Sequence, residues 1–64
     1  LADVIILLQA EIAAHIKKGG LFITSGIIDM KEQAVLDAFA GNSAFEIVEV
    51  TRMGEWVSVT ARKK

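Results

Sequence analysis

The sequence predicts an α/β fold in which two helices cover one face of a three-stranded sheet. Apolar residues recur with helical spacing in residues 3–17 and 30–40. Between them, residues 21–25 form a short apolar run bounded by glycines, which is typical of a strand. Residues 45–51 and 55–62 are predicted as two strands joined by a turn that contains Gly54, which indicates a hairpin. The order helix, strand, helix, strand, strand predicts a mixed sheet whose last strand is antiparallel.

The first helix is predicted over residues 3–17, with Asp3 as the residue that caps its first N–H groups. Its apolar stripe follows spacings of three and four and consists of Ile5, Leu8, Ile12 and Ile16. Lys17 and Lys18 suit the negative end of the helix dipole. Gly19 can adopt the left-handed conformation that ends a helix.

The first strand is predicted over residues 21–25. Leu21 to Thr24 is nearly continuous in apolar character, which predicts cover on both faces of the sheet. Ser25 and Gly26 are expected to end the strand.

The second helix is predicted over residues 30–40. Asp29 and Glu32 have the spacing of a capping box at its start. Val35, Leu36 and Phe39 form its apolar face, with Met30 at the edge. Gly41 follows as a stop signal.

The hairpin is predicted to turn at residues 52–55, where Gly54 can take a positive φ. One face of the last strand carries Val57, Val59 and Ala61, and the other carries Trp56, Ser58 and Thr60. A strand–helix–strand crossover makes the first two strands parallel. Insertion of the last strand between them gives the sheet order first, third, second. The alternative is a meander with the last strand outermost.

Composition excludes several classes of function. The chain of 64 residues has no cysteine and a single histidine, so it cannot build a thiolate or histidine-based zinc site. Its net charge of −1 provides no basic field for nucleic acid. The apolar run from Val4 to Leu8 is far shorter than the roughly 20 residues that span a bilayer. The hydrophobic content of 53% is high for so short a chain and predicts a surface that another segment covers.

Three segments carry a family resemblance. Residues 17–21, Lys-Lys-Gly-Gly-Leu, resemble the end of the helix that precedes the fifth strand in class I S-adenosylmethionine-dependent methyltransferases. Ser25-Gly26-Ile27 and Gly54-Glu55-Trp56-Val57 are together similar to ribosomal protein L-eleven methyltransferases. Leu1-Ala2 match the last two letters of that family's Asn-Ile-Leu-Ala motif.

The resemblance implies that residues 1–64 are a single partial domain, the carboxyl-terminal portion of a Rossmann-like methyltransferase sheet. The implied parent is a cytoplasmic enzyme that transfers methyl groups from S-adenosylmethionine to amino groups of ribosomal protein L-eleven. The family's asparagine, glycine-rich loop and acidic cofactor residue would all precede Leu1. We therefore assign no catalytic, cofactor-binding or metal residue to the chain. Taken alone, it is expected to be inactive, to bind no cofactor and to self-associate.

Ser25, Gly26 and Ile27 are the candidate wall of the substrate pocket. They follow a predicted parallel strand, and ligands of open α/β sheets bind beyond the carboxyl ends of such strands. The structural alternative is a strand end that needs small residues to turn toward the next helix.

The other candidate residues are better explained by structure. His15 is expected on a solvated helix face, and Asp29 with Glu32 in capping rather than acid–base chemistry. Trp56 is expected to pack over the end of the sheet rather than to stack on a ligand. Lys63 and Lys64 are expected to be solvated rather than to contact RNA. Two other functions are considered: a small non-enzymatic dimerising module, and the tail of a small-molecule methyltransferase.

Overall fold

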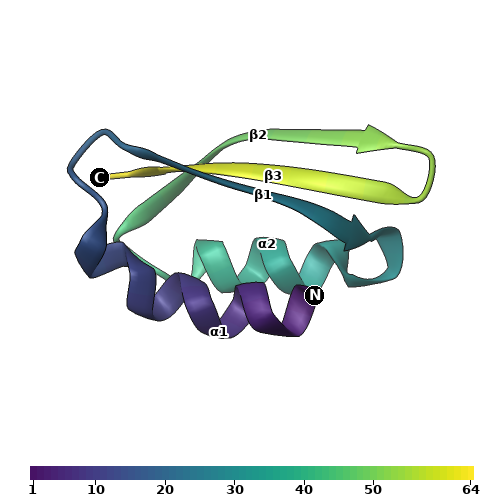
Figure 1. Ribbon diagram of the computed structural model, residues 1–64, viewed down its shortest axis with the longest axis horizontal. Coiled ribbons are helices and arrows are strands. Elements are labelled where there is room, and N and C mark those ends of the chain that lie inside the picture. The colour runs from purple at the N-terminus through teal and green to yellow at the C-terminus, as the bar shows by residue number, and fades with distance from the viewer.

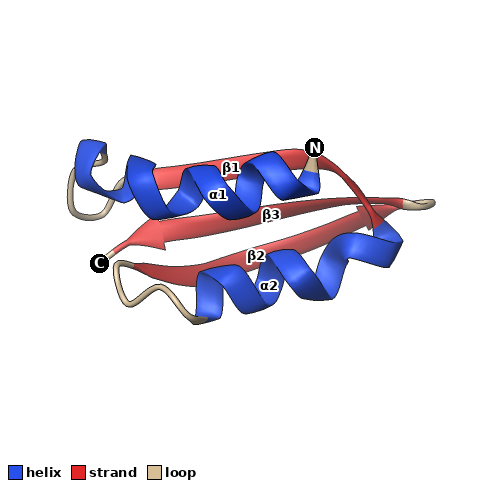
Figure 2. Cartoon of the chain, turned by 90° about the horizontal axis from the view of Figure 1, so that it is seen from below, coloured by secondary structure: helices blue, strands red, loops and turns tan.

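A computed structural model describes all residues, 1–64, and shows two layers, with both helices beneath one sheet (Figure 1). Seen from the helix side, α1 lies over β1 and α2 over β2, with β3 between them (Figure 2). The elements in chain order are α1 (Ala2–Ile12), β1 (Leu21–Ile28), α2 (Glu32–Ala40), β2 (Phe45–Met53) and β3 (Trp56–Lys63). One turn of 3-10 helix follows α1 at Ala13–His15, and another precedes α2 at Asp29–Lys31.

The sheet order is β1-β3-β2, so the last strand is inserted between the first two, as predicted. β3 runs antiparallel to both neighbours. β1 and β2 therefore point in the same direction without sharing a hydrogen bond, and every bonded pair in the chain is antiparallel. The α/β fold with both helices on one face is confirmed.

The core lies between the sheet and the two helices. Val57, Val59 and Ala61 face it from β3, as the alternation predicts, and all three are buried. Beneath them three aromatic rings meet at centroid distances of 5.6 to 6.0 Å: Phe22, Phe39 and Phe45. Two of these contacts are edge-to-face, the arrangement that the charge distribution of aromatic rings favours.

β1 is longer than predicted. The expectation that Ser25 and Gly26 end the strand was wrong, because both form a β-bulge and pairing resumes at Ile27. Two residues of β1 there oppose Ser58 alone. Gly26 has a φ of +72°, which a glycine adopts without strain. The Ser58 hydroxyl donates a hydrogen bond of 2.7 Å to the carbonyl of Thr24, directly before the bulge.

Both predicted helix caps were wrong. The N-cap of α1 is Leu1, which makes no side-chain cap bond, and Asp3 lies in the first turn instead. Asp29 begins the 3-10 turn before α2 and caps nothing through its side chain. The Glu32 carboxylate instead accepts hydrogen bonds from Arg52 of β2.

The predicted first helix also ends earlier than residue 17. α1 stops at Ile12, and the following 3-10 turn reaches only His15. Lys63, expected to be solvated, caps this end: its ammonium donates to the carbonyls of Ala13 at 2.7 Å and Ile16 at 3.2 Å. Gly19 adopts a positive φ in the following turn, as predicted.

A polar contact also links α1 to the end of α2. Gln9 is buried in α1, and its side-chain oxygen accepts a hydrogen bond of 2.6 Å from the amide of Asn42, just beyond α2. The side-chain oxygen of Asn42 accepts a hydrogen bond from the backbone N–H of Ala44. These bonds fix the loop that leads from α2 into β2.

Large apolar side chains remain outside this core. The prediction that both faces of β1 are covered was wrong within residues 1–64. Ile23 of β1 is 65% exposed on the outer face of the sheet. Leu8, placed in the apolar stripe of the first helix, is also exposed. Within this chain β1 pairs with β3 alone, so its other edge is free.

Replacement of Lys63 by methionine is expected to lower the free energy of unfolding by about 1–2 kcal/mol. The change keeps an apolar stem but leaves two carbonyls at a helix end without their charged donor. Urea unfolding of the protein measures the loss. Lys64→Met is the matched control, because Lys64 is exposed and makes no side-chain hydrogen bond. Equal effects of the two changes would contradict the capping role of Lys63.

Candidate functional site

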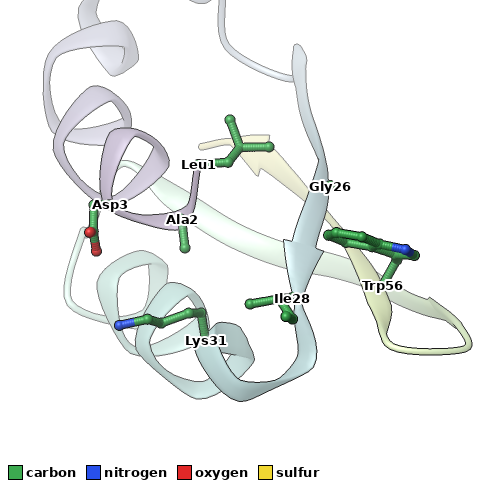
Figure 3. Close-up of a pocket in the computed structure, with 7 residues that line it drawn as sticks. All are labelled: Leu1, Ala2, Asp3, Gly26, Ile28, Lys31 and Trp56. Atoms are coloured by element: carbon green, nitrogen blue, oxygen red, sulfur yellow. The ribbon is translucent and has the colours of Figure 1, made fainter.

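A pocket of about 420 Å³ lies at the carboxyl end of β1, where the N-terminus, the bulge and the start of β3 meet (Figure 3). It is lined by Leu1, Ala2, Asp3, Gly26, Ile28, Lys31 and Trp56. A second pocket of about 250 Å³ adjoins it on the hairpin side. Gly26 and Trp56 line both, so these two residues define the boundary between the pockets.

The bulge makes room for Leu1. A Cβ added at Gly26 would lie 2.8 Å from Cδ2 of Leu1, well inside contact distance. The side chain of Leu1 therefore rests directly against the backbone of β1. Of the three residues predicted as a pocket wall, Gly26 lines both pockets and Ser25 lines the second. The side chain of Ile27 is fully buried in the core and lines neither.

Trp56 faces away from the helices. It is paired in register with Ile28 on one side and Met53 on the other, and 52% of its surface is exposed. Trp56 therefore lies at the end of the sheet, as expected, with about half of its side chain covered and the other half exposed. The sequence signal that places it on the outer face is its alternation with the buried Val57.

Charged groups surround the pockets at their rims. Asp3 and Lys31 line the larger pocket on the helix side. Arg52 lines the smaller one and forms an ion pair with Glu32, with its Nε donating at 2.9 Å. The hydrogen bond and the negative charge of Glu32 raise the pKa of Arg52 above its ordinary value. This pair ties the start of α2 to β2.

The other candidate residues lie away from the pockets. His15 is exposed at the end of the 3-10 turn after α1, and Lys64 is exposed at the C-terminus. No three His, Cys, Asp or Glu side chains gather closely enough to hold a metal ion. None of the helices has the length and apolar character needed to cross a membrane.

The residues present do not form a cradle for a nucleotide cofactor. Such a cradle needs glycine-rich backbone between a strand and the N-terminus of a helix. The three glycines with positive φ lie elsewhere: Gly19 before β1, Gly26 within it and Gly54 in the hairpin turn. The one strand-to-helix connection, from Ile28 to Asp29, contains no glycine.

Comparisons with known proteins place the chain among methyltransferases. The matching family, described as Ribosomal protein L11 methyltransferase (PrmA), covers residues 1–64. The ribosomal protein L11 methyltransferase of Lachnospira eligens is 55% identical over 64 residues, which are 100% of this chain and 20% of that protein. Those of Agathobacter rectalis and Lachnoclostridium phytofermentans are 48% and 49% identical over 63 residues, 98% of this chain and 19% of each relative.

The chain therefore belongs to the ribosomal protein L11 methyltransferase family. It spans about a fifth of the length of the curated relatives that it matches. The resemblance seen in residues 17–27 and 54–57 is confirmed by this match along the whole chain.

Replacement of Gly26 by alanine is expected to destabilise the protein by about 1–3 kcal/mol through its positive φ, with a small further loss because the flexible end of the Leu1 side chain must shift. Gly54→Ala is the matched control, since Gly54 also has a positive φ but open space at its Cβ position. Thermal unfolding should show the larger loss for Gly26→Ala. Combination with Leu1→Ala should recover the difference, and purely additive effects would contradict the contact.

Proposed function

We propose that residues 1–64 are the carboxyl-terminal part of an enzyme that methylates amino groups of ribosomal protein L11 in the cytoplasm. S-adenosylmethionine would be the methyl donor of that parent enzyme. The observation that carries the proposal is a family match over the whole chain that accounts for only a fifth of each relative. The cofactor-binding and catalytic groups would then lie in the segment that precedes Leu1.

The free edge of β1 supports the proposal that a preceding segment of the enzyme packs against this chain. Leu1 rests against Gly26 near the carboxyl end of β1, so a segment that leads into Leu1 arrives beside that edge. A preceding strand, α1 and β1 would form a strand–helix–strand crossover, which places the new strand parallel to β1. Its hydrogen bonds would satisfy the unpaired N–H and C=O groups of β1.

The exposed side of α1 supports the same arrangement. Val4, Leu7 and Leu8 line a shallow groove of about 340 Å³ together with Glu11. These side chains lie on the side of α1 that α2 does not cover, and Leu7 is 75% exposed. Burial of such side chains is worth about 1.5–3 kcal/mol each, which favours a neighbouring segment over water.

In the parent enzyme this part would provide structure and one wall of the substrate pocket. Ser25 and Gly26 would line it, with Ile27 fixing the bulge from the core side. An isolated chain would lack the cofactor site and would be inactive. The alternative function, a small non-enzymatic module that dimerises, is favoured by the same free edge and apolar helix side.

Calorimetric titration with S-adenosylmethionine is expected to distinguish the 64-residue chain from the full-length protein. The full-length protein should bind the cofactor, and S-adenosylhomocysteine as well, whereas the 64-residue chain should give no heat with either. The physical reason is that no strand-to-helix glycine loop is present in these residues. Micromolar binding by the isolated chain would contradict the proposal, and a full-length protein that fails to bind the cofactor would contradict it too.

The isolated chain is expected to self-associate through the edge of β1 and the side of α1. Sedimentation velocity should show species larger than a monomer, and Leu7→Glu should shift the distribution toward the monomer. Met30→Glu is the matched control, because Met30 is 82% exposed but does not line the groove formed by Val4, Leu7, Leu8 and Glu11. A folded monomer at high concentration would contradict this expectation.

A further inference from the structure

We propose that the end of the molecule opposite the pockets is a cationic surface that binds the phosphate backbone of double-stranded RNA. This surface, which we name the basic end, is formed by the turn after α1 and the C-terminal part of β3. Its members are Lys17, Lys18, Arg62, Lys63 and Lys64. The proposal goes beyond the proposed function and rests on it only for the choice of RNA, since a ribosomal protein is itself a partner of RNA.

The fold gathers at one end cations that are far apart in the sequence. The backbone N–H of Lys63 donates to the carbonyl of Gly20 at 2.8 Å, and the Lys63 carbonyl accepts from the N–H of Gly19 at 2.7 Å. These bonds continue the pairing of β1 with β3 into the glycines that directly follow Lys17 and Lys18. Figure 1 shows the C-terminus beside the end of α1, with the hairpin turn at the opposite end.

Charge is segregated along the long axis of the molecule. Five of the seven lysine and arginine residues lie in the basic end. Two carboxylates lie near it, Glu11 in the last turn of α1 and Glu46 at the start of β2. Four others lie toward the opposite end: Asp3, Asp29, Glu32 and Glu55. The net charge of −1 averages over both ends, so it does not describe the field at the basic end.

Most cations of the basic end have no partner within the chain. Lys17, Lys18 and Lys64 are exposed and take part in no ion pair. Arg62 lies 3.3 Å from Glu46, with about half of each side chain exposed, and an exposed pair of this kind adds little stability in water. Three lysines with unpaired charges therefore face solvent beside an arginine whose ion pair is weak.

The shape of the basic end favours an extended polyanion over a small anion. None of its residues lines any of the three pockets. A small phosphate ligand binds in a concave site where several polar groups converge. A nucleic acid duplex needs no such pocket, because lysines that neutralise its closely spaced phosphates release counterions, and this release drives binding.

The residue types favour contact with the backbone of a duplex. Three of the four solvent-facing cations are lysines, which act as hydrated point charges and lack the planar fork that reads bases. The basic end contains no aromatic residue on which the bases of a single strand would stack. Lysine is also depleted in protein–protein interfaces. We therefore assign the surface to duplex RNA, and an acidic protein partner becomes an outcome of the test.

The test uses the full-length enzyme and a fluorescein-labelled RNA duplex of about 20 base pairs, long enough to span a typical protein contact. Fluorescence anisotropy between about 50 and 200 mM KCl gives the slope of log K against log [KCl]. Replacement of Lys17, Lys18 and Lys64 together by glutamine should reduce the magnitude of the slope by roughly 2–3, since each phosphate contact contributes about 0.9. The affinity at low salt should fall by about tenfold or more.

Single substitutions provide a matched control. Lys18→Gln should reduce the magnitude of the slope by about 0.9. Lys31→Gln removes an exposed lysine from the opposite end of the molecule and should leave the slope unchanged. Thermal unfolding of the triple variant should match that of the unaltered enzyme, because the three side chains are exposed.

Equal slopes for the triple variant and the unaltered enzyme would overturn the proposal, as would absence of binding to the duplex. Poly-glutamate that competes as strongly as unlabelled RNA would overturn it too, because the surface would then fit an acidic protein. Methylation of ribosomal protein L11 by the triple variant, without RNA, should stay within about twofold of the unaltered enzyme. Failure of the unaltered enzyme to methylate that protein would instead overturn the proposed function, while the anisotropy measurement would still decide whether the basic end binds RNA.

Discussion

The position of β3 between β1 and β2 is the constraint on which the rest of the structure depends. β3 pairs with both neighbours, and its Val57, Val59 and Ala61 form the buried apolar row of the sheet. Because β3 comes last in the chain, β1 has no partner among these residues until residues 56–62 are in place. The sheet therefore depends on contacts between residues far apart in sequence, which are slow to form and costly in chain entropy.

The same constraint organises the two ends of the sheet. At one end the C-terminal part of β3 reaches the turn after α1, where Lys63 caps carbonyls of the helix end. At the other end the first residue of β3, Trp56, stands beside the bulge of β1. β3 thus carries both the Lys63 cap at one end and the lining of the candidate pocket at the other.

The core beneath β3 is small, with 12 of 64 residues buried, so much of the apolar surface faces outward.

Sequence patterns predicted the element order, the fold class and the buried face of β3, because strand alternation and helical spacing are local signals. They did not predict the bulge: Ser-Gly is an ordinary strand end, and only the length of β3 shows that pairing continues past it. The two helix caps failed for a similar reason. Glu32 has the spacing of a capping residue, but Arg52, twenty residues later, takes its carboxylate. Lys63 is likewise recruited by a helix end that lies distant in sequence.

Pockets lie beside Ser25 and Gly26, but the role of these residues as the wall of a substrate pocket stays a prediction. The carboxyl end of β1 is where the pockets lie, yet the largest exposed side chain there, Trp56, comes from β3 and not from the predicted segment. Its outward face follows from alternation with Val57, whereas its nearness to Leu1 and Gly26 follows only from the inserted strand. The family match, and not these 64 residues alone, suggests what kind of enzyme the pockets belong to.

The central claim is that the free edge of β1 is completed by a strand from the preceding part of a larger enzyme. Hydrogen exchange of the full-length protein, resolved to single amides of β1, tests it most directly. The account predicts that the β1 amides that point away from β3 exchange as slowly as the amides within β3. Rapid exchange of those amides, at the rate of a solvent-exposed edge, would contradict the account.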